Sequence, residues 1–380
     1  MSKRIVHVIT RFINGGADEN TLASCNWNAE NGDDVYLIYG NHVAPEIIEK
    51  LHPRVTHIQV PNIQRDISPH KDYAAYKDLV SIFRRIKPDL VHTHTSKAGI
   101  IGRAAAAKLK ITAVHGVHIA PFLNVNPISK LVYSAAERVA SRWTAAYIHV
   151  SEAMQAACEE AGIGRGRPHF MIRSGMNVTD FAEAHPPEDW EPIVGVAPGT
   201  PKPPIIVMIA ALEERKRQIP FIENLHYVWK QCPDARLLLL GDGINRPAVE
   251  EAISKTAHPD QIRLLGFRKD PARILALADV AALCSTREGL PRVAIQYVAS
   301  GTPSVIAALP GIEEIIRDGV EGIITSPTDV SETAIATGKL LSDADMRARM
   351  SAACRAKDIS NWSINTMCER QEQVYKQVLN

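Results

Sequence analysis

The chain has 380 residues, of which 46% are hydrophobic, so it can form more than one packed core. Its 43 lysines and arginines nearly balance its 42 aspartates and glutamates, and this net charge of +1 does not suggest a nucleic-acid partner. No apolar run approaches the roughly 18 residues that span a bilayer, and six scattered cysteines form no zinc or redox motif. We expect a cytoplasmic protein with reduced thiols.

The charge is distributed unevenly along the chain. Residues 1–180 contain 21 basic and 16 acidic side chains, so this half is positive and the remainder is negative. Such an excess fits either a solvated face or contact with an anionic acceptor or membrane surface. Peripheral membrane contact through the N-terminal half is therefore one of two open interpretations.

Apolar strand-like runs alternate with helical patterns along most of the chain. This rhythm predicts an α/β protein with two Rossmann-like, doubly wound parallel sheets. The expected strands of the first series are 4–10, 34–39, 56–61, 89–93, 111–115 and 146–151, and those of the second are 205–211, 236–241, 262–265, 280–284, 304–307 and 322–324.

A proline-dense segment separates the two series and predicts a linker, because proline is unsuited to helix interiors and central strands. We expect an N-terminal domain over 1–187, the linker over 188–204 and a second domain over 205–360. Residues 361–380 form a last helical stretch.

Two loops of the first half carry candidate site residues. Gly15 and Gly16 follow the first strand and open a helix, where bare backbone and unpaired N–H groups suit an anion, although a plain tight turn also uses Gly-Gly. His92, His94, His115 and His118 fall at or just past strand ends. No acidic residue accompanies these histidines at ligand spacing, so we expect no metal site from them.

Residues 285–305 are the most informative stretch. The pattern predicts a strand end, a loop with Glu288, Gly289 and Leu290, and a short helix opened by Pro291 and closed by Gly301. Unpaired N–H groups at that helix start suit a phosphate. Arg292 lies in the first turn, where its positive charge opposes the helix dipole, and a bound anion would explain this placement. The alternative is an ordinary surface arginine.

The stretch from Glu288 to Pro303 resembles the signature of the retaining glycosyltransferases of family 4, which share the two-domain GT-B fold. That resemblance implies two Rossmann-like domains facing across a cleft, with the acceptor bound by the domain over 1–187 and the nucleotide-sugar by the domain over 205–360. It also implies that the last helix packs back toward the N-terminal domain. In the usual form two glutamates are separated by seven residues; here Glu288 holds the first position and Gln296 the second. The resemblance gives Glu288 the hydroxyls of the donor sugar and Gln296 the ribose.

Further positions take their roles from the same resemblance. His115 in Val-His-Gly would lie near the reaction centre, with His118 as the competing register. Lys216, helped by Arg215, would neutralise the donor diphosphate, although Ala211 stands where the family has an arginine. Gly241 belongs to a Gly-Asp-Gly loop, and Phe267 with Arg268 to the loop that faces the base.

The resulting hypothesis is a retaining, metal-independent glycosyltransferase with no cofactor other than its nucleotide-sugar donor, which we expect to be a UDP-sugar. Its acceptor would be a hydroxyl of a glycan, a lipid-linked saccharide or a small molecule, as in polysaccharide biosynthesis. The Gln296 and Ala211 departures leave two alternatives open: a degenerate glycan-binding or scaffold protein, and a UDP-sugar hydrolase or epimerase of the same fold. A nicotinamide dehydrogenase is disfavoured because no Gly-x-Gly-x-x-Gly opens a helix after a strand.

Overall fold

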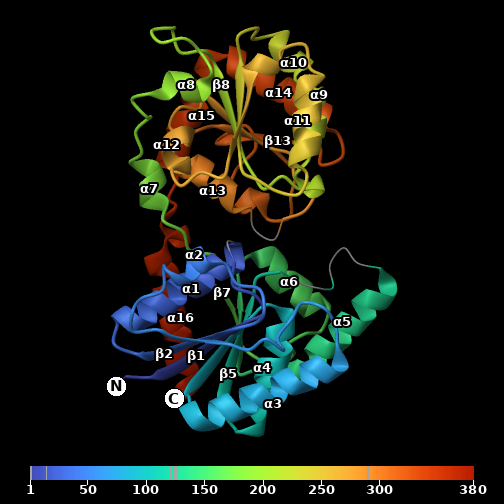
Figure 1. The fold of residues 1–380 in the computed structure, drawn as a ribbon, viewed down its shortest axis with the longest axis vertical. Coiled ribbons are helices and arrows are strands. Elements are labelled where there is room, and N and C mark those ends of the chain that lie inside the picture. Colours follow the sequence, from blue (N-terminus) through green and yellow to red (C-terminus); the bar gives the residue numbers. More distant parts are fainter. Residues whose placement is uncertain (1, 14, 120–121, 123–125, 289–290) are drawn as a thin grey trace. The chain divides into compact units, whose positions relative to one another are not determined.

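The computed structural model describes residues 2–13, 15–119, 122, 126–288 and 291–380. The chain divides into two compact units, unit 1 formed by Met1–Met176 with Ser360–Asn380 and unit 2 formed by Asn177–Ile359. Each unit contains one parallel sheet with helices on both faces (Figure 1). The predicted fold class, two parallel α/β sheets, is confirmed.

Unit 1 has a seven-stranded sheet in the order β3-β2-β1-β4-β5-β6-β7. One face packs against α3 and α4, where Val6, Val8 and Val91 lie in a common core with helix residues such as Leu79. The other face packs against α1 and α16. The elements are β1 (Arg4–Ile9), α1 (Gly16–Glu30), β2 (Asp34–Tyr39), α2 (Pro45–Ile48), β3 (Thr56–Gln59), α3 (Pro69–Ile86), β4 (Leu90–His94), α4 (Ser96–Lys108), β5 (Thr112–Val117), α5 (Pro127–Ala140), β6 (Ala146–His149), α6 (Glu152–Glu160), β7 (His169–Met171) and α16 (Ile364–Leu379).

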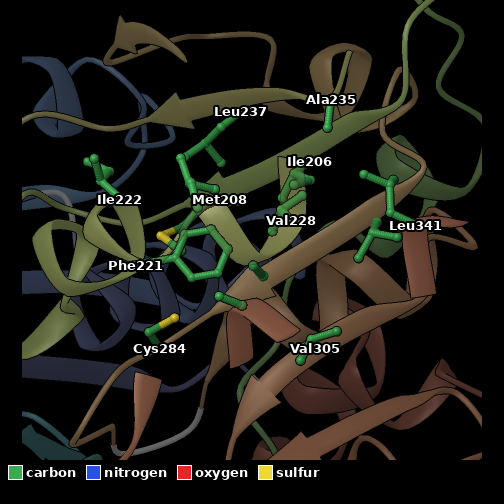
Figure 2. Close-up of a cluster of buried hydrophobic side chains, with 14 of the residues drawn as sticks. Ile206, Met208, Phe221, Ile222, Val228, Ala235, Leu237, Cys284, Val305 and Leu341 are labelled. Atoms are coloured by element: carbon green, nitrogen blue, oxygen red, sulfur yellow. The ribbon is translucent and has the colours of Figure 1, made fainter. Parts of the chain in front are cut away.

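Unit 2 has a six-stranded sheet in the order β10-β9-β8-β11-β12-β13. Phe221 and Ile222 of α9 pack with Ile206, Met208 and other buried strand residues on one face, as Figure 2 shows. The elements are α7 (Val178–Ala182), α8 (Trp190–Val194), β8 (Ile205–Ile209), α9 (Gln218–Glu223), α10 (His226–Trp229), β9 (Arg236–Leu240), α11 (Arg246–Ser254), β10 (Ile262–Gly266), α12 (Pro271–Leu275), β11 (Val280–Leu283), α13 (Arg292–Ala299), β12 (Ser304–Ala307), β13 (Gly322–Thr325), α14 (Val330–Ser342) and α15 (Ala344–Ala356).

The boundary between the two units lies before the proline-dense segment that was predicted to be the linker. Unit 2 already begins at Asn177, and residues 188–204 belong to it. Within that segment α8 packs against β10 and fully buries Val194, while Gly195 closes the helix in a left-handed conformation. These few apolar residues are enough to fix a proline-rich stretch onto a sheet.

Within the described residues, no helix is long and apolar enough to cross a membrane.

Candidate active site

The strand order of unit 2 reverses between β8 and β11, which are neighbours although other strands separate them in the chain. Ligands of open parallel sheets bind at such a switch point, outside the carboxyl ends of the strands. The segment after β8 contains Arg215 and Lys216, and the segment after β11 contains Glu288. The backbone joins the two segments, since Thr286 N donates to Arg215 O at 2.9 Å.

A three-membered ion cluster occupies this point. The Glu288 carboxylate pairs with the Lys216 ammonium through Oε1 and with Arg215 Nη1 through Oε2, the latter at 3.1 Å. The side chains of Lys216 and Glu288 are only 10% and 12% exposed, so both charges are largely shielded from water. Pairing and charge-assisted hydrogen bonds offset the cost of burying them.

The glycines of the Gly-Asp-Gly loop allow close backbone contact with the segment after β8. Gly241 has φ +138°, and a Cβ there would lie 2.0 Å from Ala210 O. A Cβ on Gly243 would lie 2.5 Å from Leu212 O. Both positions therefore require glycine for packing alone, so their presence is not by itself evidence of a nucleotide.

The loop after β10 carries the two residues expected near the base. Phe267 is 71% exposed, a large apolar side chain left in water. Arg268 forms an ion pair with Asp270 at 2.7 Å. The Phe267 ring is thus accessible for stacking with a planar group such as a base, whereas the Arg268 guanidinium is already paired with Asp270.

Helix α13 positions the remaining residues of unit 2. Arg292 is its first helical residue and Pro291 its N-cap, one residue later than the sequence indicated. Gly289 and Leu290, also expected at this site, lie outside the described residues. Gln296 Oε1 is buried and has no hydrogen-bond partner among the described residues, which is uncommon for a native side chain and points to an absent ligand or water.

Sequence analysis missed Tyr297, which fixes α13 to the sheet. Its hydroxyl accepts from Ile209 N and donates to Ala282 O, both at 3.2 Å, and so joins the ends of β8 and β11. Burial raises the pKa of Tyr297 well above its ordinary value. An aromatic residue next to Gln296 was the only available signal, and it equally fits a core position.

Unit 1 has its own switch point, between β1 and β4. Gly15 is the N-cap of α1, and Gly16 is its first residue. Asp18 in the first turn is buried, and desolvation raises the pKa of its carboxyl to about 7, with Arg11 opposing the shift. Thr95, just after β4, has φ +62° and bonds Thr10 at 2.8 Å between hydroxyls. A left-handed threonine is strained, as residues at functional sites often are.

The two candidate histidines of β5 and its end lie in different surroundings. His115 is 3% exposed, bonds Thr93 Oγ1 through Nδ1 at 2.9 Å, and lines a small pocket with Ser96. Burial, with the nearby Arg103 charge, lowers the pKa of His115 well below its ordinary value, so the ring is neutral. His118 instead bonds His94 at 3.1 Å.

Two family models match this chain, one in each half. The family described as Glycosyltransferase Family 4 matches residues 14–173, and the family described as Glycosyl transferases group 1 matches residues 196–357. The chain belongs to glycosyltransferase family 4. It is 26% identical over 322 residues to the UDP-Gal:alpha-D-GlcNAc-diphosphoundecaprenol alpha-1,3-galactosyltransferase of Escherichia coli, covering 83% of this chain and 82% of that protein.

Solved structures of GT-B glycosyltransferases share the fold. A glycosyltransferase from Rickettsia africae ESF-5 superposes with a TM-score of 0.82 at 19% identity, over 100% of both chains. Anabaena Alr3699/HepE in complex with UDP-glucose superposes with a TM-score of 0.80 at 21% identity, over 98% of this chain and 100% of that one. The predicted family and the GT-B architecture are confirmed.

In this family 4 chain, the expected site residues form one contacting set and several separate ones. Arg215, Lys216 and Glu288 contact one another directly. Gly241 packs beside the segment that precedes them, and Gln296 lies on the helix that follows. Gly15, Gly16 and His115 belong to unit 1, and the roles of all these residues in the reaction remain predictions.

Proposed function

We propose that the chain transfers a sugar from a UDP-sugar to a hydroxyl acceptor, with retention of the anomeric configuration and without a metal ion at the diphosphate. The observation that carries this proposal is the shielded Glu288–Lys216–Arg215 cluster at the unit 2 switch point. A site with two cations around one carboxylate suits a diphosphate next to a sugar hydroxyl. The relatives named for UDP-Gal and crystallised with UDP-glucose support the choice of nucleotide.

Lys216 and Arg215 would stabilise the charge that develops on the leaving diphosphate. The guanidinium of Arg215 contacts the same carboxylate as Lys216. Arg215 would therefore replace the family's arginine, whose position holds Ala211 in this chain. Glu288 would exchange part of its pairing for hydrogen bonds to donor-sugar hydroxyls. Gln296 Oε1 would accept from a ribose hydroxyl and so lose its unsatisfied state.

The acceptor hydroxyl would belong to a lipid-linked saccharide, reached by peripheral membrane contact through α5. Ile128, Leu131 and Val132 on this helix are 78%, 66% and 51% exposed, and the exposed basic residues Lys130 and Arg138 accompany them. Apolar side chains with neighbouring cations suit the surface of an anionic bilayer. The lipid diphosphate named for the Escherichia coli relative supports the same class of acceptor.

A nucleotide-sugar panel tests the donor. The midpoint temperature of thermal unfolding should rise most with one UDP-sugar, because ligand binding stabilises the folded state. Transfer to a hydroxyl, with the anomeric centre followed by NMR, would then show retention. Nucleotide release that never requires an acceptor would favour a hydrolase, epimerisation of the donor would favour an epimerase, and binding without turnover would favour a scaffold.

Lys216→Ala tests the diphosphate site. It should weaken UDP binding by about 1–3 kcal/mol, the usual loss for a charged hydrogen bond. Lys202→Ala is the matched control, since Lys202 pairs with Asp279 at 2.9 Å on an exposed part of unit 2. Equal UDP affinities of wild type and Lys216→Ala would contradict the assignment.

Leu131→Glu tests the membrane surface. Co-sedimentation with vesicles containing anionic lipid should fall in this variant and remain in Ile335→Glu, whose exposed isoleucine lies on α14 of unit 2. Activity on a water-soluble acceptor should be unchanged in both variants. Equal sedimentation of Leu131→Glu and wild type would exclude α5 as the contact.

A further inference from the structure

Three buried histidines converge on one face of the unit 1 sheet. His7 on β1 stands in register with His92 on the neighbouring β4, and His94 follows two residues later on the same side of that strand. The three side chains are at most 1% exposed. This face packs against α1 and α16, whereas His115 lies among the residues of the opposite face.

The ring nitrogens are close enough to share one ligand. One nitrogen of each ring lies within 4.8 Å of the corresponding nitrogens of the other two. His7 Nδ1 and His94 Nε2 are 3.1 Å apart. Two imidazoles on a tetrahedral zinc, with Zn–N distances of 2.0–2.1 Å, have nitrogens roughly 3.3 Å apart, so this pair already has nearly the required spacing.

The hydrogen bonds of the cluster are incomplete. His92 Nε2 is buried and finds no partner within the part of the chain that the structure describes, whereas the His7 ring also interacts with the side chain of Asn28. A neutral imidazole buried with an unsatisfied nitrogen is costly, and such atoms in native structures point to an absent water or ion. The cluster therefore contains one unexplained nitrogen, His92 Nε2, beside a pair of nitrogens, His7 Nδ1 and His94 Nε2, that are already near ligand spacing.

The surroundings orient the rings as outer partners of a metal site do. Tyr375 OH of α16 lies 2.6 Å from His92 Nδ1, which leaves His92 Nε2 as the available nitrogen. His118 Nε2 lies 3.1 Å from His94 Nδ1 and leaves Nε2 of His94 directed at His7. Such outer contacts fix the ring orientation and the tautomer of ligating histidines.

Glycine at position 116 keeps the space beside the rings open. Gly116 is the strand partner of His94 in the sheet. A Cβ at this position would lie 3.2 Å from His92 Nε2 and 3.3 Å from His94 Nδ1, tighter than ordinary contact.

We propose that His7, His92 and His94 form a binding site for one zinc-like divalent transition metal ion, with a water molecule as the fourth ligand. Imidazole nitrogens suit zinc, and three histidines with one open position are a common zinc ligand set. The ion would be structural, because it joins β1 to β4 and, through Tyr375, fixes α16 on the sheet. It is separate from the metal-free sugar transfer proposed above.

Metal content and cobalt spectroscopy test the site. Untagged full-length protein, produced with zinc in the medium and dialysed, should carry about one zinc per chain. Metal-free wild type titrated with Co²⁺ should develop the visible bands of a tetrahedral cobalt site. Zn²⁺ in excess over its dissociation constant should raise the thermal midpoint by on the order of 5 °C.

Variants locate the ion. His92→Gln and His94→Gln should lose the zinc, and Tyr375→Phe should weaken zinc affinity by about tenfold, as loss of an outer partner does. The matched control is His149→Gln, because His149 is equally buried but lies against His169, with 2.9 Å between its Nε2 and His169 Nδ1, and not in the three-histidine cluster. Two results would overturn the proposal: wild-type protein that is purified without zinc and develops no cobalt bands on titration, or zinc retained in the His92→Gln and His94→Gln variants. If a variant fails to fold, the cobalt titration of wild type decides alone.

Discussion

The two switch points of this molecule use different chemistry at the same topological position. In unit 2 the segments after β8 and β11 bring together three charged side chains around Glu288. In unit 1 the hydroxyls of Thr10 and Thr95 join the segments after β1 and β4, and α1, which follows β1, carries a buried Asp18 whose raised pKa favours its neutral form. A fixed set of charges suits a diphosphate that gains charge as it leaves. A largely neutral polar site suits hydroxyl groups, which carry no charge to compensate.

The largest expected effect comes from removing the carboxylate of the charged site. Glu288→Ala should lower turnover by roughly 10²–10³, as loss of one preorganised hydrogen-bonding group in an active site does. UDP affinity should change far less, because Lys216 and Arg215 remain and are released from the Glu288 carboxylate. Turnover and calorimetric UDP affinity measured on the same preparation separate the two effects.

Glu213→Ala is the matched control for Glu288→Ala. Glu213 also pairs with Arg215, at 2.7 Å, but its side chain is 45% exposed, so its loss should cost little. If Glu288→Ala turns over at the wild-type rate, the charged site has no role in sugar recognition and the comparison between the two units loses its functional meaning.

The second prediction concerns His115 of unit 1, whose ring is neutral. His115→Gln should lower turnover by about a hundredfold, typical of a lost general acid–base or polarising group, with UDP affinity nearly unchanged. Because the pKa of His115 is well below its ordinary value, the wild-type rate should show no inflection from this ring near pH 6.5. His118→Gln is the comparison variant, since its ring bonds His94 instead of lining the pocket. A larger loss in His118→Gln would transfer the role to that residue.

The third prediction uses the titration of Asp18. Its folded-state pKa of about 7 lies above the unfolded value of 3.8, so the folded form binds the proton more tightly. The resulting stability is complete below about pH 4 and is lost as pH rises through 7, by up to about 1.4 kcal/mol per pH unit. Denaturant unfolding of unit 1 should show this decline in wild type, and Asp18→Asn should flatten it. Glu19→Gln, at the exposed neighbouring position, removes only a minor contribution to the Asp18 pKa and should reduce the decline far less than Asp18→Asn.

Alternating apolar runs were sufficient to predict both sheets, because parallel strands buried on two faces leave a clear pattern. The seventh strand of unit 1, β7, was missed since its three half-buried residues, His169–Met171, give no such pattern. The Glu288 and Lys216 contact follows from the family resemblance and the order of the strands. The approach of His7 to His92 could not be predicted, because 85 residues separate them and only strand register brings them together.

The smallest expected effect concerns Gln296, and it tests the alignment of α13 itself. If the buried Oε1 meets the ribose, Gln296→Glu replaces a neutral acceptor by a charged one, which makes a hydrogen bond roughly twice as strong. UDP binding should therefore be preserved or tightened, by about 1 kcal/mol at most, because the added charge also has to be buried. Calorimetry of the two forms measures the difference, and Gln296→Ala provides the control in which the acceptor is lost and binding weakens. A marked loss of UDP affinity in Gln296→Glu would show that the side chain faces an environment that excludes an anion, such as a neighbouring phosphate, and that α13 does not meet the ribose in this register.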